Sequence, residues 1–560
     1  MTLKNLLLSV LLLATTLCVA EDKKLSRELH ARVDRLAALQ QDPGEMVDVI
    51  IQFRPEAQMS SRITKMLRLG AQHRKSLDVI HGGLFRIPAG LLPKLAQDPD
   101  VTYVSPDREV IKASPEDFIL DATQASYVFQ YGYDGSGIGI AEIDSGISPG
   151  NPDLRNPYNG GSRVVYSESF ISGLNASDQY GHGTHVAGLL AGNGGASDGW
   201  MRGIAQNANL INLRVLDANG VGTDSAVIAA IQRAIQLKST YNIRIINLSL
   251  GRGISESYKL DPLCQAVEQA WKAGIVVVVA AGNYGRDNSM NTDGYGLITA
   301  PGNDPYVITV GATNTHGTDQ TSDDTVASYS SKGPTLIDHV VKPDLVAPGN
   351  SVVSLIAPGS TLDKGHPSHE VPASEYGGYP SGPFYFRLSG TSMATPLVSG
   401  TVALMLQRIS YLTPDQVKIR LMKQATKAYP AYTYGISRNA GTVYDLQDDV
   451  FAVGAGYLNS YGAVFSNELP SGGSLSPIAV PDGFGNILLQ PDASSAWASS
   501  ITWGSSIIWG TNVLEGSSII WGSSIVWGNS TAAGYSIIWG NSIIWGSSTQ
   551  AMSESGDSDQ

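Results

Sequence analysis

The chain has 560 residues, of which 42% are hydrophobic and 16% are charged, and this composition excludes a disordered chain and a coiled coil. The length exceeds that of one compact domain, so we expect a large domain with further segments attached to it. Lysine and arginine total 37 against 50 aspartate and glutamate residues, which gives a formal net charge of −13. Such an acidic chain is not expected to bind nucleic acid, because the phosphate backbone attracts basic surfaces.

The N-terminus has an apolar segment that is typical of a secretory signal peptide. Residues 6–20 are mostly apolar and follow Lys4, and this run is shorter than the roughly 17 to 25 residues that span a bilayer. We therefore predict that residues 1–20 are cleaved and that the mature chain has no transmembrane segment; the alternative is an N-terminal anchor. Cleavage leaves Cys264 as the single cysteine, which excludes an intramolecular disulfide.

Residues 21–118 show the pattern of a small α+β unit. Short strands are predicted at residues 46–53 and 101–104, and apolar residues recur at helical spacing in three further segments. These segments contain Leu29, Val33 and Leu36; Ile63 and Leu67; and Leu91, Leu92 and Leu95. The order of elements fits a split-βαβ, ferredoxin-like unit, and no pattern within it indicates chemistry of its own.

From about residue 138 to residue 406, apolar strands alternate with longer segments of helical character. Uninterrupted apolar strands need cover on both faces, which predicts a mostly parallel sheet between helices. We therefore expect one large α/β domain over residues 119–465. The predicted strands are residues 139–143, 210–215, 243–248, 275–281 and 306–310.

The composition changes after residue 465. Residues 466–495 are rich in Pro, Gly and Ser and are predicted to be a linker. Residues 496–549 form Trp-Gly repeats with a period of six, and residues 550–560 form an acidic tail. An even period places the tryptophans on one side of an extended chain, which favours a β-solenoid, whereas a flexible low-complexity anchor is the alternative. The repeated tryptophans are Trp497, Trp503, Trp509, Trp521, Trp527, Trp539 and Trp545.

Two candidate catalytic residues follow apolar or glycine-rich segments. Asp144 ends a predicted strand, and catalytic groups gather at the carboxyl edge of parallel sheets; its alternative is a turn-forming aspartate. His182 stands among small residues in the segment 181–188, at the start of an apolar helix. Its alternatives are a packed core histidine and a metal ligand paired with His185.

Ser392 and Asn283 supply the other two chemical groups. Ser392 enters an apolar helix, where unpaired N–H groups could bind an oxyanion; the alternative is a simple helix cap. A serine nucleophile needs a base and an orienting acid, and His182 and Asp144 can supply them. Asn283 ends an apolar strand, where its amide could donate to the same oxyanion or simply form a turn.

In this order, the four positions resemble those of the subtilisin-like serine peptidases. The matching segments are residues 143–146 (Ile-Asp-Ser-Gly), 181–188, 281–283 (Ala-Gly-Asn), 342–349 and 390–396 (Gly-Thr-Ser-Met-Ala-Thr-Pro). The resemblance covers about residues 119 to 465 and implies an α/β subtilisin-like fold. It also implies that Ser392 is the nucleophile, His182 the general base, Asp144 the orienting acid and Asn283 an oxyanion-hole donor.

The resemblance extends to the binding of substrate. It implies that Ser249, Leu250 and Gly251, together with the segment that begins at Gly220, pair with a polypeptide as an added strand. A further set of small residues would line a roomy primary pocket without a fixed charge, which favours broad or apolar specificity. These residues are Ala280, Ala281 and Gly282.

The resemblance also gives roles to the remaining parts. Residues 21–118 would be an inhibitory and folding-assisting propeptide, cut between about Glu109 and Ala122; the alternative is a permanently attached domain. Structural calcium is implied as well, and Asp153 matches a position that can bind it. No ligand set is assigned, because the loop that completes the best-known calcium site of the family is missing after Gly188.

We therefore expect a secreted or cell-envelope-associated serine endopeptidase that is made as a self-processing zymogen. Its expected partners are polypeptide substrates, its own propeptide and an envelope component that binds the repeats. The alternative is a non-enzymatic surface protein in which a degenerate peptidase domain presents the repeats. The enzyme is favoured because all four chemical positions are filled.

Overall fold

The computed structural model divides the chain into two compact units, Met1–Lys112 and Ala113–Gln560. The described residues do not include the predicted signal peptide. They also leave out nearly all of the Trp-Gly repeats and most of the predicted processing region. None of the helices in the described part of the chain has the length and apolar character that a membrane span requires. The structure describes residues 24–26, 29, 33, 46–55, 58–107, 118–148, 150–289, 292, 294–372, 375, 384–427, 432–438, 441–481, 487–492, 494, 549–551 and 556–557.

The N-terminal unit is built on a four-stranded antiparallel sheet with the order β2-β3-β1-β4. Alternate strand residues form its core, because every second side chain points to the same face; Val49, Ile51, Phe85 and Val104 are all fully buried. This arrangement confirms the predicted small α+β unit. Its elements are β1 (Met46–Phe53), α3 (Met59–Arg68), β2 (Gln72–Leu77), η1 (Asp78–Ile80), β3 (Gly82–Pro88), η2 (Ala89–Leu91), α4 (Leu92–Gln97) and β4 (Val101–Pro106).

The hairpin of β2 and β3 was not predicted from the sequence. β2 has the sequence QHRKSL, and none of its residues is fully buried, so it lacks the apolar alternation that identifies a strand. It is an edge strand of the sheet, where charged side chains are typical because they hinder pairing with other chains.

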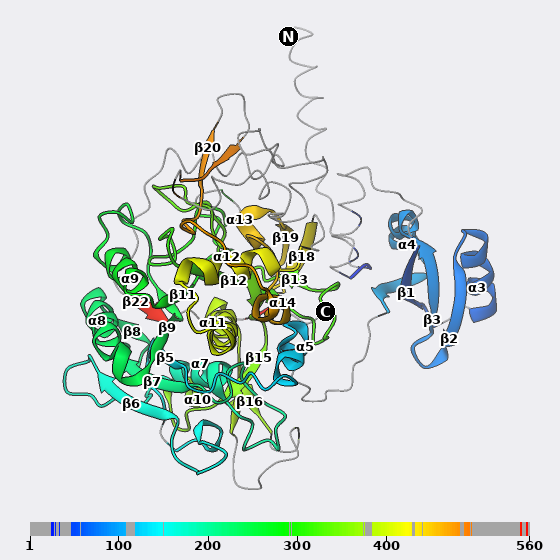
Figure 1. Ribbon diagram of the computed structural model, residues 1–560. Coiled ribbons are helices and arrows are strands. Elements are labelled where there is room, and N and C mark those ends of the chain that lie inside the picture. Colours follow the sequence, from blue (N-terminus) through cyan, green and yellow to red (C-terminus); the bar gives the residue numbers. More distant parts are fainter. Residues whose placement is uncertain are drawn as a thin grey trace, which may run out of the picture. The chain divides into compact units, whose positions relative to one another are not determined.

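The C-terminal unit is centred on an eight-stranded sheet with the order β13-β12-β11-β9-β5-β7-β6, in which β14 also pairs with β12 (Figure 1). Its pairs are parallel except for the short edge strand β13. This confirms the predicted mostly parallel sheet. The strands are β5 (Gly139–Asp144), β6 (Val164–Ser169), β7 (Asn209–Arg214), β9 (Ile243–Leu248), β11 (Val276–Ala280), β12 (Ile308–Asn314), β13 (Thr325–Val326) and β14 (Leu345–Pro348).

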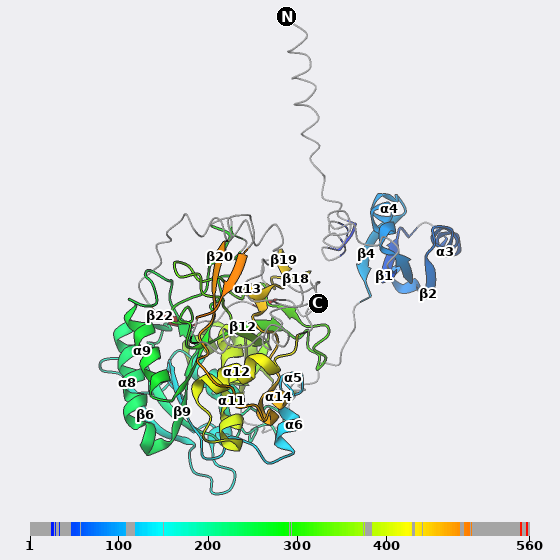
Figure 2. The same cartoon turned by 45° about the horizontal axis from the view of Figure 1, so that its top comes forward.

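Helices cover the sheet on both sides (Figures 1 and 2). The helices α8 and α9 pack side by side against β9 and β11, while α11 packs against α7 and against β9, β11 and β12. The helices of this unit are α5 (Phe118–Ala122), α6 (Ala125–Phe129), η3 (Pro152–Leu154), α7 (His182–Ala191), α8 (Asp224–Tyr241), α9 (Pro262–Lys272), α10 (Thr361–Gly365), η4 (Pro367–His369), α11 (Thr391–Arg408), α12 (Pro414–Gln424), α13 (Val450–Val453) and α14 (Ser460–Phe465).

Smaller sheets surround this core. One of them has the order β10-β22-β8, and a second has the order β15-β17-β16; the pairs β18-β19 and β20-β21 are hairpins. These strands are β8 (Val221–Gly222), β10 (Leu250–Gly251), β15 (Val352–Leu355), β16 (Glu370–Val371), β17 (Tyr385–Leu388), β18 (Tyr432–Ile436), β19 (Val443–Gln447), β20 (Ile478–Pro481), β21 (Ile487–Gln490) and β22 (Thr549–Ala551).

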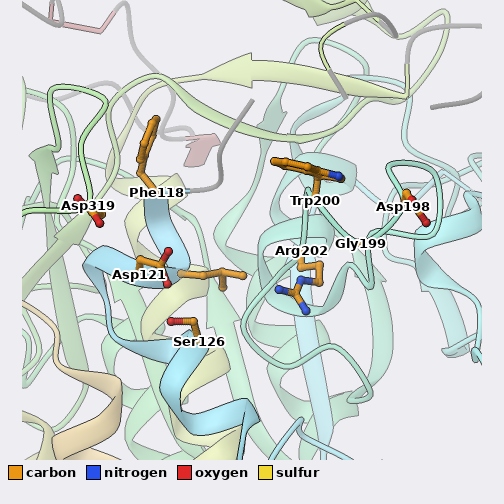
Figure 3. Close-up of a pocket in the computed structure, with 9 residues that line it drawn as sticks. Phe118, Asp121, Ser126, Asp198, Gly199, Trp200, Arg202 and Asp319 are labelled. Carbon is orange, nitrogen blue, oxygen red and sulfur yellow. The ribbon is translucent and has the colours of Figure 1, made fainter. Parts of the chain in front are cut away.

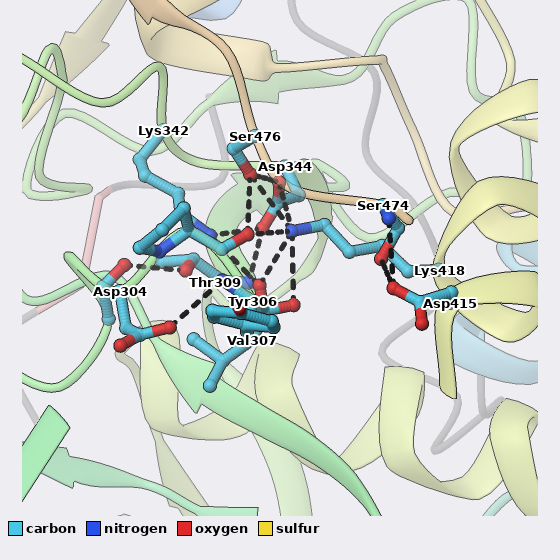
Figure 4. Close-up of polar contacts among 12 residues, drawn as sticks. Asp304, Tyr306, Val307, Thr309, Lys342, Asp344, Asp415, Lys418, Ser474 and Ser476 are labelled. Atoms are coloured by element: carbon cyan, nitrogen blue, oxygen red, sulfur yellow. Dashed lines mark hydrogen bonds and ion pairs between the residues drawn. The ribbon is translucent and has the colours of Figure 1, made fainter. Parts of the chain in front are cut away.

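The segment predicted to be a linker, residues 466–495, contains ordered structure in its described part. Besides the hairpin of β20 and β21, it contributes Ser476, whose buried hydroxyl donates to Asp344 at 2.6 Å and accepts from Lys418 at 2.9 Å (Figure 4). Lys342 donates to the other oxygen of Asp344 at 2.7 Å. Composition alone could not reveal this packing, because loops held against a domain are as rich in Pro, Gly and Ser as free linkers are.

Candidate active site

Asp144 and His182 meet at the carboxyl edge of the central sheet. Asp144 is the last residue of β5 and His182 is the first residue of α7, and the Nδ1 atom of His182 lies 2.8 Å from Oδ1 of Asp144. Both side chains are at most 1% exposed. Since Nδ1–H donates to the carboxylate, a neutral imidazole carries its free lone pair on Nε2. The Nε2 atom has no hydrogen-bond partner among the described groups, so it can accept a proton.

A buried aspartate that the sequence analysis did not single out, Asp178, joins the segments that carry this pair. Its Oδ1 atom accepts from the Ser145 hydroxyl at 2.8 Å and from the Gly181 amide at 2.7 Å, and its Oδ2 atom accepts from the Thr184 amide at 2.8 Å. Burial raises the pKa of the Asp178 carboxyl, although these hydrogen bonds act in the opposite direction. The sequence carries no signal for this role, because aspartate is common in polar loops.

Ser392 lies in the first turn of α11, where backbone N–H groups have no acceptor within the helix. Its hydroxyl donates to the Ser249 carbonyl at 2.9 Å, and the Ser249 hydroxyl donates to the Ser392 carbonyl at 3.0 Å. Helix α11 packs against α7, which begins with His182. The structure thus joins Asp144 to His182 by a hydrogen bond, whereas the Ser392 hydroxyl is bonded to Ser249 and not to His182.

Asn283 is oriented by the residue that precedes Ser392. The amide N–H and the hydroxyl of Thr391 both donate to Oδ1 of Asn283 at 2.9 Å. The Nδ2 atom of Asn283 is buried and has no hydrogen-bond partner among the described groups. An amide with its oxygen fixed and its N–H₂ group unpaired can donate to a negative charge that develops beside Ser392. Sequence reasoning identified Asn283 but missed Thr391.

The residues predicted to line the primary pocket lie next to Asn283. Ala280 is the last residue of β11, and Ala281 and Gly282 connect it to Asn283. All three are fully or nearly fully buried, and Gly282 has a φ of 108°, in the left-handed region that favours glycine. Their contact with a substrate side chain stays a prediction.

The segments predicted to bind substrate pair with another part of the same chain. β8 and β10 are the outer strands of a three-stranded antiparallel sheet, and β22 is its middle strand. Gly220 precedes β8 with a φ of 75°, and a Cβ atom there would lie 2.6 Å from the Tyr180 ring. The paired residues are Leu250 with Ala551, Gly251 with Gln550, Val221 with Gln550, and Gly222 with Thr549.

A further carboxyl group lies close to the Asp144–His182 pair. Glu142 is on β5, two residues before Asp144, and is 1% exposed. Neither of its carboxyl oxygens has a hydrogen-bond partner among the described groups. Burial, and then the charges of Asp144 and Asp178, raise the pKa of Glu142 well above its usual value. We therefore expect this carboxyl group to stay protonated above the pH at which an exposed glutamate ionises.

Comparison with known proteins gives the family. A family model described as the subtilase family matches residues 135–456. The chain belongs to the subtilase family. It is 40% identical over 347 residues to the serine protease AprX of Bacillus subtilis (strain 168). The aligned region covers 60% of this chain and 72% of that protein. It is also 36% identical over 313 residues to subtilisin DY of Bacillus licheniformis. That alignment covers 56% of this chain and 92% of subtilisin DY. It is 33% identical over 355 residues to the extracellular serine proteinase of Thermus sp. (strain Rt41A). That alignment covers 62% of this chain and 71% of the proteinase.

These matches establish that this subtilase is a serine endopeptidase of the subtilisin type. The range matched by the family model contains Asp144, His182, Asn283 and Ser392. The predicted enzyme class is therefore confirmed, and the non-enzymatic alternative loses its basis.

The structure of this subtilase does not support Asp153 as a calcium ligand. Its Oδ2 atom accepts from the Tyr385 hydroxyl at 2.6 Å, and its Oδ1 atom accepts from the Ala196 amide at 2.7 Å. Burial raises the pKa of the Asp153 carboxyl, although the hydrogen bonds from Tyr385 and Ala196 act in the opposite direction. Within the described part of the chain, no group of three or more His, Cys, Asp or Glu side chains is arranged to hold a metal ion.

His185, the alternative metal partner of His182, has a structural role in this subtilase. Its Nε2 atom lies 3.0 Å from the Phe386 carbonyl and 3.2 Å from the Val352 carbonyl, so Nε2–H donates to backbone oxygens. Burial, and then the neighbouring His182, lower the pKa of His185 to about 3. The imidazole is therefore neutral and joins α7 to β15 and β17.

A surface hollow in this subtilase lies apart from the candidate catalytic residues (Figure 3). Phe118 and Trp200 face it from two segments, and Arg202 and Asp121 supply polar groups. None of Asp144, His182, Asn283 and Ser392 lines it, so it has no part in the proposed reaction.

Proposed function

We propose that this subtilase hydrolyses peptide bonds through a triad of Asp144, His182 and Ser392. The observation that carries the proposal is the buried 2.8 Å hydrogen bond between Asp144 and His182, which leaves Nε2 of the imidazole unpaired. His182 takes the proton from the Ser392 hydroxyl as Oγ attacks the substrate carbonyl, and then gives it to the leaving amine. Asp144 holds the tautomer and stabilises the imidazolium. Water then hydrolyses the acyl ester and restores the serine.

The oxyanion of the tetrahedral intermediate is bound by two donors from different elements. One is Nδ2 of Asn283, whose partner atom Oδ1 is held by Thr391. The other is the backbone N–H of Ser392 in the first turn of α11, where the positive end of the helix dipole favours negative charge.

Binding of an extended substrate explains how Ser392 becomes a nucleophile. In the structure, where the described part of β22 ends opposite Leu250, the Ser392 hydroxyl donates to the Ser249 carbonyl. A substrate strand that pairs with β10 brings a backbone N–H group to the same carbonyl, and this donor competes with the hydroxyl. The Ser392 hydroxyl can then donate to Nε2 of His182, which completes the triad.

The same proposal assigns roles to the other parts of the chain. The N-terminal α+β unit is a propeptide, cut between about residues 109 and 122, and the enzyme is exported as a zymogen. One relative, from Thermus sp. (strain Rt41A), is an extracellular serine proteinase, which supports export. The small, uncharged residues Ala280, Ala281 and Gly282 favour broad or apolar specificity at the primary pocket.

Covalent labelling tests the proposed nucleophile. A serine-directed phosphonate is expected to label the wild-type protein at Ser392 and to leave Ser392→Ala unlabelled. A library of peptides, read by mass spectrometry, should show cleavage by the wild-type protein and none by the variant. A correctly folded wild-type protein that takes no label and cuts no peptide would contradict the proposed triad.

A further inference from the structure

The strand β22, red in Figure 1, occupies the place between β8 and β10 that the proposed function assigns to a substrate. It pairs in antiparallel fashion with both neighbours, so it is the central strand of this small sheet. Because neighbouring strands of a sheet lie about 4.8 Å apart, the place between β8 and β10 holds one strand at a time. A substrate strand can therefore bind there only after β22 has left.

The same place adjoins the proposed nucleophile. β10 begins one residue after Ser249, whose carbonyl accepts the Ser392 hydroxyl at 2.9 Å. On the other strand, Gly222 pairs with Thr549 on one side and with Leu216 on the other. The edge of β8 that faces away from β22 is thus used within the domain, and the edge that β22 covers is the one that β8 can offer to an extended peptide.

A buried carboxylate site holds the same part of the chain at a second point. Asp557 is 1% exposed, and its Oδ1 atom accepts from Arg286 at 2.8 Å and from the Ser328 hydroxyl at 2.5 Å. Its Oδ2 atom accepts from the Ser328 amide at 2.7 Å. The Asn350 side chain accepts from the Asp557 amide at 2.7 Å and donates to the Asp557 carbonyl at 3.0 Å. Every polar atom of Asp557 therefore has a partner, and the bond from Arg286 is of the stronger, charge-assisted kind.

The residues of this site are also held by each other and by the rest of the domain. The Nε atom of Arg286 donates to the Ser328 hydroxyl at 2.8 Å, and its guanidinium group lies 5.4 Å from the centre of the Tyr329 ring. The Asn350 side chain donates to the side-chain oxygen of Asn314 at 3.0 Å. Side chains that are already fixed lose little conformational freedom when a carboxylate binds, which favours binding.

The backbone next to Asp557 fits the same site. The Gly556 carbonyl accepts from the Arg438 amide at 3.1 Å, and Asp557 forms an isolated β-bridge with Ser437. A Cβ atom on Gly556 would lie 2.5 Å from the side-chain oxygen of Asn350, which is too close for any residue other than glycine. The contact therefore involves the backbone as well as the carboxylate.

We propose that residues 549–557 are a built-in competitive inhibitor of this subtilase, in which β22 excludes substrate from the place between β8 and β10 and Asp557 holds the segment there. The inference rests on the proposed function, because that function assigns this place to the substrate. Two contacts on one short segment support each other, since binding of one raises the effective concentration of the other. Loss of the Asp557 contact should therefore also free the place that β22 occupies.

The test measures how the enzyme binds an extended substrate. The full chain is purified as the active enzyme with a reversible peptide-boronate inhibitor, which is then removed, and its intact mass is recorded before each assay. A serine-directed phosphonate gives the concentration of active sites. Initial rates are measured with a chromogenic peptide that is long enough to pair with β8 and β10. A competitive inhibitor raises KM and leaves kcat unchanged, so KM is the decisive quantity.

Two variants weaken the two contacts separately. Gln550→Pro removes the backbone N–H of a central-strand residue, and Asp557→Asn removes the charge that Arg286 holds. Each should lower KM by about tenfold at unchanged kcat, because a bond to a charged group or a strand pairing is lost. Gln550→Ala keeps the backbone N–H and should behave as the wild type does. Asp319→Asn removes the same charge from an exposed residue and should also leave KM unchanged.

A synthetic peptide tests the same contacts as a separate molecule. It has the sequence of residues 547–558, with both ends blocked so that they carry no charge. Added to the full-chain Gln550→Pro enzyme, it should inhibit competitively and raise KM again. The same peptide carrying Asp557→Asn should need about a tenfold higher concentration for the same effect, because it lacks the charge that Arg286 binds.

The outcomes separate this inference from the proposed function. An unchanged KM in Gln550→Pro or in Asp557→Asn overturns the built-in inhibitor, and so does a synthetic peptide that does not compete. An active enzyme whose intact mass lacks residues 549–557 overturns it too, because a missing segment cannot inhibit. A KM that rises with enzyme concentration overturns inhibition within one chain. A correctly folded protein that takes no phosphonate label and hydrolyses no peptide contradicts the proposed function instead.

Discussion

Thr391 donates two hydrogen bonds, from its backbone amide and from its hydroxyl, to the side-chain oxygen of Asn283, each at 2.9 Å. Because the oxygen is held in this way, the amide orientation of Asn283 is set and its Nδ2 group is left to donate elsewhere. Thr391 is the residue directly before Ser392, so the start of α11 positions the proposed nucleophile and the proposed oxyanion donor together.

The first prediction concerns this pair. Asn283→Ala should lower kcat by about 100- to 1000-fold with little change in KM, because the lost donor acts on the transition state. Thr391→Val keeps the shape but removes the hydroxyl and should lower kcat by about fivefold, which corresponds to about 1 kcal/mol for one hydrogen bond. Thr391→Ser should restore activity. Equal rates for the valine and serine variants would contradict the orienting role of the hydroxyl.

The second prediction concerns the tautomer of His182. In Asp144→Asn the side-chain amide can donate to Nδ1, so the proton moves to Nε2 and the imidazole can no longer take the proton of Ser392. We expect kcat to fall by about 10⁴-fold at neutral pH with the fold unchanged. Steady-state kinetics and circular dichroism check this expectation, and a loss smaller than tenfold would show that Asp144 does not orient the base.

The third prediction follows from the raised pKa of Glu142. Burial and the charges of Asp144 and Asp178 keep this carboxyl protonated in the folded protein at pH values where the unfolded chain is ionised. The protonated Glu142 therefore makes its full contribution to the free energy of unfolding below about pH 4, the usual pKa of glutamate. This contribution is lost as the pH rises through the raised pKa of the folded protein. Glu142→Gln cannot ionise and avoids this loss.

The melting temperature checks this dependence. On a Ser392→Ala background, which prevents self-digestion, the variant Glu142→Gln should gain in melting temperature over its parent as the pH rises from 5 to 8. Glu256 is exposed, and Glu256→Gln is the control that should show no such trend. A constant difference between Glu142→Gln and its parent at all pH values would contradict a buried, protonated carboxyl.

The fourth prediction concerns the ion-pair cluster of Figure 4. Lys418 is fully buried, lies 3.2 Å from Asp344, and donates to Ser476 at 2.9 Å. Although burial raises the pKa of the Asp344 carboxyl, the nearby Lys342 and Lys418 outweigh it and hold that pKa below its usual value. Removing one partner of a buried pair leaves charge uncompensated, so Lys418→Met should lower the free energy of unfolding by about 3 to 5 kcal/mol.

A second lysine on the same helix provides the control. Lys423 pairs with Glu468, whose side chain is 47% exposed, and such surface pairs contribute about 0 to 1 kcal/mol. Lys423→Met should therefore have little effect in the same denaturant titrations of the Ser392→Ala protein. If both variants lost the same free energy of unfolding, the segment after residue 465 would not be stabilised through Lys418.

Several features of the chain could be read from local patterns. Unbroken apolar runs such as residues 275–281 predicted buried parallel strands, because a strand covered on both faces has no polar side to show. Asp144, His182, Asn283 and Ser392 stand out because each adjoins a strand end or a helix start of recognisable composition. The polar strand β2 was missed, since it has no buried alternation. The packed segment around Ser476 was predicted to be a linker because it is rich in Pro, Gly and Ser, as free linkers are.

The sequence by itself therefore determined the class of fold, the family and the four candidate chemical groups, because each of these depends on a short local sequence pattern. Only the tertiary structure decided which groups meet. Thr391 bonds to Asn283 across 108 residues, and Arg286 bonds to Asp557 across 271 residues, so no local spacing reveals either pair. The placement of β22 between β8 and β10 has the same origin, because an open strand edge accepts any extended segment that the fold brings to it.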